Sequence, residues 1–234
     1  MPTDPFRTHE LDDDALDAEL VERWDALLPA QPELGRSLLA RYAEPHRRYH
    51  DRAHLLTVLA VVDQLAGDED LFLVRLAAWF HDAVYDLPER ELTNEEASAR
   101  LAIRSLSRAG FEQEDITQVA RMVRLTATHA PGGRDPEGEL LCDADLAVLA
   151  APADRYQAYV AAVREEYAAV PEEDFLAGRL AVLEPLAATE IFRSGKAQSL
   201  KPAARTNLEQ ELWSIRDRLG LEQPDDVAVG DSRR

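Results

Sequence analysis

An adjacent pair of ionisable residues, His81 and Asp82, interrupts a strongly apolar segment that begins near residue 71. The segment has helical spacing, and the bulky side chains of Trp79 and Phe80 directly precede the pair. Burying an imidazole and a carboxylate costs free energy unless hydrogen bonds or a metal ion satisfy them. Taken alone, these residues favour a hydrogen-bonded His–Asp couple, and a metal site is the alternative.

Other residues favour the metal site. A histidine lies upstream at His50, and two acids lie downstream at Asp143 and Asp145. Two imidazoles and two carboxylates suit Mn²⁺, Fe²⁺, Co²⁺, Ni²⁺, Mg²⁺ or Zn²⁺. Their combined charge would offset a divalent ion and leave coordination positions open for water and substrate.

Hydrophobic spacing predicts an all-α protein of nine or ten helices. The expected helices cover residues 13–27, 34–42, 45–66, 71–85, 94–109, 114–128, 143–150, 154–167, 172–188 and 201–219. The sequence has no convincing alternating strand pattern, no fixed repeat and no dividing linker. We therefore expect one domain over residues 13–220, between disordered segments at 1–12 and 221–234.

The composition restricts the partners. The chain has 45 acidic and 26 basic residues, a formal charge of −19, which repels nucleic-acid phosphates. A single cysteine, Cys142, excludes an intrachain disulfide and suits a reducing compartment. Residues 1–14 have no apolar leader, and the apolar stretch 55–62 is too short to cross a bilayer. We expect a cytoplasmic protein that binds neither a nucleic-acid polymer nor a membrane.

Several catalytic signatures are absent from the sequence. It contains no phosphate-binding P-loop, no Gly-x-Ser-x-Gly elbow and no His-Glu-x-x-His helix. Hydrolysis by a serine or cysteine nucleophile therefore has no sequence support.

Six segments together resemble an uncharacterised subgroup of the HD-domain superfamily, whose members are described as predicted metal-dependent phosphohydrolases. They are YAEPHRRYHDRAH at 42–54, WFHDAVYD at 79–86, NEEASA at 94–99, TH at 128–129, DADL at 143–146 and ARTNL at 204–208. The resemblance runs from about residue 41 to about residue 219, and it implies an HD-type helical bundle.

The resemblance also implies metal ligands. His50, His81 and Asp82 would bind one divalent ion, with a second ion as an alternative. The fourth ligand is expected to be Asp145, in its Ala-Asp context, with Asp143 as the runner-up. Residues two apart cannot share a helical face, and Asp143 is expected to cap the helix instead.

Arg47, His54, His129 and Arg205 are candidates for binding the substrate. Each has a structural alternative: ion pairs for the arginines, a core or ligand-supporting position for His54, and a helix C-cap for His129. Residues 164–167 are interpreted as a helix-surface or packing feature without a catalytic role.

Asp86 and Glu95 are the candidates for a general base. Some superfamily members carry a glutamate after the His–Asp pair, where this chain has Tyr85 and Asp86. A solvated carboxylate in the first helical turn is the alternative for Glu95.

These observations together predict a metal-dependent phosphohydrolase acting on a small phosphorylated metabolite or nucleotide, of the phosphomonoesterase or nucleotide pyrophosphohydrolase class. A catalytically silent metal- or nucleotide-binding regulatory module is the alternative. A purely structural helical protein is the third possibility.

Overall fold

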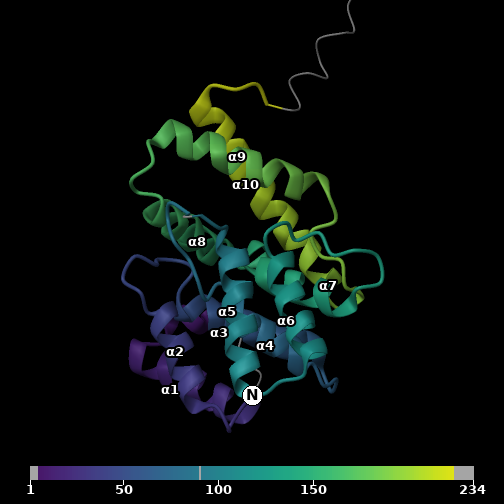
Figure 1. The fold of residues 1–234 in the computed structure, drawn as a ribbon. Coiled ribbons are helices and arrows are strands. Elements are labelled where there is room, and N and C mark those ends of the chain that lie inside the picture. Colours follow the sequence, from purple (N-terminus) through teal and green to yellow (C-terminus); the bar gives the residue numbers. More distant parts are fainter. Residues whose placement is uncertain (1–4, 90, 224–234) are drawn as a thin grey trace, which may run out of the picture.

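The structure is a computed structural model that describes residues 5–89 and 91–223, and throughout these residues it contains helices and no strands (Figure 1). The elements are η1 (Pro5–Glu10), α1 (Asp13–Leu27), α2 (Pro32–Tyr42), α3 (Arg52–Ala66), α4 (Phe72–Phe80), α5 (Asn94–Ala109), α6 (Gln113–Leu125), α7 (Pro136–Asp145), η2 (Leu146–Ala150), α8 (Ala153–Glu166), α9 (Glu172–Ala188), η3 (Gly195–Leu200) and α10 (Lys201–Leu219). The predicted all-α fold is confirmed.

The core lies around α3 and α4. From residue 76 to residue 80, every side chain of α4 is fully buried. Trp79 meets Trp24 of α1 edge-on, with ring centroids 5.0 Å apart. Helix α5 packs along α6, and α9 packs along α10 at the end of the molecule opposite α1 and α2 (Figure 1).

Helices with local capping signals begin and end close to the predicted residues. Asp12 accepts a hydrogen bond from the Ala15 amide at the start of α1. Thr93 caps α5, and Gly110 ends that helix with a left-handed φ of 84°. The side chain of Glu96, in the first turn of α5, pairs with Arg100 of α5 and Arg124 of α6.

Helix α3 begins later than predicted. The Asp51 carboxylate accepts hydrogen bonds from the amides of Ala53 and His54, which sets the first turn at Arg52. His46 and His50 therefore lie before the helix, although the helix predicted over 45–66 included them.

Helix α4 ends at Phe80, five residues before the predicted end. Side chains from other elements bind the backbone groups that a longer helix would have used. Arg47 donates to the Asp82 carbonyl, Ser98 accepts from the Val84 amide, and Asn94 accepts from the Asp86 amide. His81 and Asp82 are thus held in turns at the end of the helix.

The helix predicted over 143–150 is displaced. Asp135 caps α7 by accepting from the Gly138 amide, and Pro136 occupies the first helical position. The turns of η2 then follow Asp145. Asp143 lies near the end of α7, so its predicted role as an N-cap is wrong.

The N-terminal segment is more ordered than predicted over residues 5–10, which form η1. The Thr8 side chain is buried, and its hydroxyl donates to the Ala53 carbonyl of α3. Residues 221–223 follow α10 without regular structure, and the rest of the predicted C-terminal tail, like residues 1–4, lies outside the described residues. Within residues 5–89 and 91–223, no helix has the length and apolar character needed to cross a membrane.

Candidate metal centre

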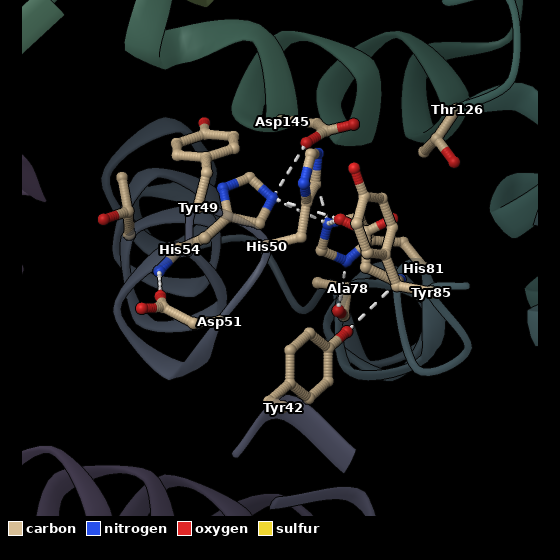
Figure 2. A network of polar contacts seen from close by, with 12 residues as sticks. Tyr42, Tyr49, His50, Asp51, His54, Ala78, His81, Tyr85, Thr126 and Asp145 are labelled. Atoms are coloured by element: carbon tan, nitrogen blue, oxygen red, sulfur yellow. Dashed lines mark hydrogen bonds and ion pairs between the residues drawn. The ribbon is translucent and has the colours of Figure 1, made fainter. Parts of the chain in front are cut away.

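Four side chains converge between the start of α3, the end of α4 and the end of α7 (Figure 2). His54 Nε2 lies 3.1 Å from His81 Nε2, 3.4 Å from Asp82 Oδ2 and 3.2 Å from Asp145 Oδ1. His81 Nε2 lies 3.2 Å from Asp82 Oδ2 and 3.6 Å from Asp145 Oδ1. We call these four residues the metal cluster.

The orientation of His81 follows from one local hydrogen bond. Its Nδ1 lies 2.7 Å from the carbonyl oxygen of Ala78, one turn earlier in the chain. A carbonyl only accepts, so Nδ1 carries the proton of the neutral ring and Nε2 presents its lone pair to the metal cluster. The ring is fully buried, which makes this orientation hard to change.

Asp145 is oriented by His129, whose Nε2 lies 2.8 Å from Asp145 Oδ2. The other oxygen of the carboxylate faces His54 and His81. His129 follows α6 in a left-handed conformation, with φ of 49°. His129 therefore contributes to the site by orienting the Asp145 carboxylate. It is not one of the four cluster residues.

The charges of the cluster stabilise one another. Burial acts against the charged form of every member, yet the neighbouring carboxylates hold the pKa of His81 well above its usual value. Hydrogen bonds to Asp145 and Asp82 likewise outweigh burial and raise the pKa of His54. His81 and its neighbours in turn hold the pKa values of Asp82 and Asp145 well below the usual range, again against the effect of burial.

The donor set fits a divalent cation. Ligands bound at about 2.0–2.2 Å in tetrahedral or octahedral geometry lie roughly 2.8–3.6 Å apart. The five separations given above, which join His54 and His81 to each other and to Asp82 and Asp145, run from 3.1 to 3.6 Å and fall in this range. Ligand atoms of His54, His81 and Asp82 can be chosen that all lie within 4.8 Å of one another. Two neutral imidazoles and two carboxylates would balance a charge of +2.

His50, the predicted first ligand, lies beside the cluster rather than in it. Its Nδ1 is 2.7 Å from Glu166 Oε2, and its ring stacks on Tyr85 with centroids 4.1 Å apart. His54, predicted to bind substrate or to support a ligand, has taken the place expected for His50. The later start of α3 explains the exchange, since only His54 projects from the helix.

Glu166 was missed by the sequence analysis, which interpreted residues 164–167 as a surface or packing feature. Its side chain is fully buried and accepts from the amides of Arg48, Tyr49 and His50. It also accepts from the Tyr85 hydroxyl. Burial opposes ionisation, but the hydrogen bonds from His50 and these amides lower the pKa of Glu166 to about 2.

The side chains of Asp143 and Asp145 lie on different sides of α7, as their two-residue spacing requires. Asp145 lies in the cluster, whereas Asp143 is fully buried on another side of the helix. Its two oxygens accept from the amides of Arg193 and Ser194, just before η3. Asp143 therefore anchors a distant loop.

The predicted substrate arginines lie elsewhere. The Arg47 side chain is fully buried and donates to the carbonyls of His50 and Asp82. It ties together the two segments that carry the site, and a substrate cannot reach it in this conformation. Arg205 is 77% exposed on α10 and pairs with Glu209, so the structure does not bring it to the cluster.

A cavity of about 490 Å³ has His50 in its wall, and none of the four cluster residues lines it. Tyr85, Tyr159 and Arg179 line it, together with Glu95, one of the two predicted general bases. Asp86, the other, is not among the lining residues, and its backbone is fixed by the Asn94 side chain.

No family model, no curated protein and no solved structure matches the chain. The assignment of the site consequently depends on its own geometry and chemistry.

Proposed function

We propose that this protein is a metal-dependent phosphohydrolase of the HD-domain superfamily that acts on a small phosphorylated molecule in the cytoplasm. The observation that carries this proposal is the metal cluster, in which two imidazole nitrogens and two carboxylate oxygens converge at ligand-like separations. His54, His81, Asp82 and Asp145 would hold the ion. When bound, a divalent ion there would act as a Lewis acid toward water and a phosphoryl oxygen.

The adjoining cavity supports a small substrate. Its volume of about 490 Å³ suits a metabolite, with the phosphoryl group at the cluster and the organic part against Tyr85 and Tyr159. The chain's net charge of −19 opposes a nucleic-acid polymer. Glu95 lines the same cavity and remains the candidate for accepting a proton from water.

The alternative is a metal-binding regulatory module without turnover. Two arginines near the site favour this alternative, because both already have hydrogen-bond partners within the protein that a phosphoryl group would have to replace. Arg47 is buried on backbone carbonyls, and Arg179 makes two hydrogen bonds to the Glu211 carboxylate. In the phosphohydrolase, by contrast, the bound metal would have to supply the positive charge that stabilises the phosphoryl group.

Elemental analysis tests the cluster on protein purified without a metal-affinity tag. We expect about one divalent ion per chain, and its absence in Asp82→Asn. A phosphate-release screen with Mn²⁺, Mg²⁺, Co²⁺ and Ni²⁺ then tests turnover, on phosphomonoesters and on nucleoside triphosphates. Metal content without phosphate release from any compound would favour the regulatory module, whereas absence of metal in every condition would exclude both functions.

A further inference from the structure

A second cavity, separate from the one beside His50, lies between α1, α3 and α4. Its volume is about 340 Å³. Two arginines, Arg23 of α1 and Arg75 of α4, line it, and none of the four cluster residues does. The metal cluster and the proposed phosphohydrolase reaction therefore do not account for this cavity.

One carboxylate brings the two guanidinium groups together. Asp63 of α3 accepts from Arg23 Nη1 at its Oδ2 and from Arg75 Nε at its Oδ1, both at 2.7 Å. The three residues come from three helices, so the packing of α1 and α4 on α3 fixes how the guanidinium groups are placed. The arginine side chains are 24% and 26% exposed, so they are largely removed from bulk water while they still line the cavity.

Most hydrogen-bond donors of the arginine pair are left over. A guanidinium group has five N–H bonds in a planar fork. Arg23 donates through Nε to Glu19 and through Nη1 to Asp63, whereas Arg75 donates only through Nε. In the part of the chain that the structure describes, Arg23 Nη2 and both terminal nitrogens of Arg75 have no hydrogen-bond acceptor. The edge formed by the two terminal nitrogens of Arg75 can bind a carboxylate through two parallel hydrogen bonds.

The rest of the cavity wall is largely apolar. Leu27, Leu59, Phe72 and Trp79 contribute to it from the same three helices. Leu59 and Trp79 belong to the buried core, so this part of the wall is rigidly packed. Pockets for small molecules typically combine such a wall with a few polar groups that fix the orientation of the ligand.

We propose that this cavity binds a small organic carboxylate, with the carboxylate group on Arg75 and Arg23 and the apolar body against Phe72 and Trp79. The inference goes beyond the proposed phosphohydrolase function and does not depend on it. A ligand of this class would satisfy the unused N–H groups and cover the apolar wall at the same time.

The charges around the arginines favour a monoanion over a phosphate. The two guanidinium groups share Asp63, which leaves one positive charge in excess among these three residues. Two further carboxylates lie close by: Glu19 pairs with Arg23, and Asp70, in the cavity wall, accepts from the Phe72 amide. A phosphate dianion would bring a second negative charge next to these carboxylates, whereas a carboxylate brings only one.

Nitrogen NMR on the full chain, with benzoate as the probe, tests the site. The protein is first stripped of metal with EDTA and dialysed, so that benzoate cannot bind an ion in the cluster. Benzoate should shift the indole N–H signal of Trp79 in a saturable way and leave that of Trp213, which is 58% exposed on α10, unchanged. Benzyl alcohol, which lacks the charge, and inorganic phosphate, which lacks the apolar body, should cause no such shift. An unmoved Trp79 signal, or an equal response to either control compound, would overturn the proposal.

Substitutions locate the carboxylate group. Arg75→Lys keeps a positive charge beside Asp63 but loses the two-nitrogen edge, so its Kd for benzoate should rise at least about 10-fold. Arg23→Gln should raise the Kd by a similar factor. Arg36→Gln is the matched control, because Arg36 is 59% exposed on α2, pairs with Glu33 and changes the net charge equally. An unchanged Kd in both cavity variants, or an equal rise in Arg36→Gln, would contradict the assignment.

The comparison of benzoate with its two control compounds uses the wild type, so it decides the question even if a cavity variant fails to fold. Benzoate binding should also persist in Asp82→Asn, since the metal cluster takes no part in it. Loss of binding in that variant would overturn the proposal. Absence of metal or of phosphate release in the wild type would instead refute the proposed function and leave this inference standing.

Discussion

Asp143 and Asp145 lie two residues apart at the end of α7, and their carboxylates point to different sides of that helix. Asp145 faces His54 in the metal cluster, while Asp143 accepts from the amides of Arg193 and Ser194. One short segment thus contributes both to the candidate site and to the anchoring of the loop before η3.

This division predicts opposite phenotypes for two isosteric substitutions. Asp145→Asn should lose the metal, because a neutral amide is a poor ligand for a divalent cation. Asp143→Asn should keep the metal but lower the free energy of unfolding by about 1–3 kcal/mol, because its NH₂ group would face a backbone donor. Elemental analysis and urea unfolding measure the two effects. Metal loss in Asp143→Asn alone would reverse the assignment.

His54, rather than His50, should be the upstream ligand. His54→Gln is expected to abolish metal binding, since its Nε2 lies within 3.4 Å of three other cluster atoms. His46→Gln is the matched control, because His46 is 45% exposed and bonds to the Tyr85 carbonyl. Isothermal titration with Mn²⁺ distinguishes them, and tight binding by His54→Gln would contradict the geometry.

His129 should raise the affinity of the site for the metal without being a ligand itself. Its ring orients Asp145 from outside the cluster, and loss of such supporting hydrogen bonds typically weakens metal binding about 10–100-fold. His129→Ala should therefore bind Mn²⁺ with a correspondingly higher Kd and still reach full occupancy at high metal concentration. Failure to bind at any concentration would make His129 a ligand.

Chelation should destabilise the protein. An ion present at about 100 times its Kd adds roughly 2.7 kcal/mol, equivalent to some 5–10 °C in Tm for a chain of this size. EDTA should lower Tm by this amount, and Mn²⁺ or Ni²⁺ should restore it. Asp82→Asn, lacking a cluster carboxylate, should melt at the same temperature with and without EDTA.

Glu166 should stabilise the fold at neutral pH but not in acid. Its pKa is lowered to about 2 from the usual 4.5, so its contribution is present above pH 4.5 and is lost as the pH falls toward 2. The full shift corresponds to about 3 kcal/mol. Urea unfolding should show Glu166→Gln less stable than the wild type by this order at pH 7, and the difference should shrink steadily below pH 4.5. A difference independent of pH would exclude this linkage.

The helices themselves were largely predictable. Thr93 and Gly110 mark the ends of α5, and the predicted bounds of α9 and α10 agree with the structure. Such signals act within a single helical turn, so they can be recognised wherever they occur in a sequence. The involvement of His81 and of its neighbouring acid was predictable for a similar reason, since two ionisable groups beside an apolar segment require partners.

The choice between His50 and His54 was not predictable from spacing. It depends on where α3 begins, and Asp51 places that start after His50. The spacing between Asp143 and Asp145 likewise showed that their side chains must diverge, but the residues that each one meets come from distant segments.

Sequence alone therefore determined the all-α class, most of the helices, and the residue types from which a metal site could be built. Only the tertiary structure decided that His54 joins the cluster, that Arg47 is buried on the carbonyls of His50 and Asp82, and that Glu166 holds His50. The physical reason is the range of the interactions. Caps and helical periodicity arise between residues a few positions apart, whereas Arg47 meets Asp82 across 35 residues and Glu166 meets His50 across 116.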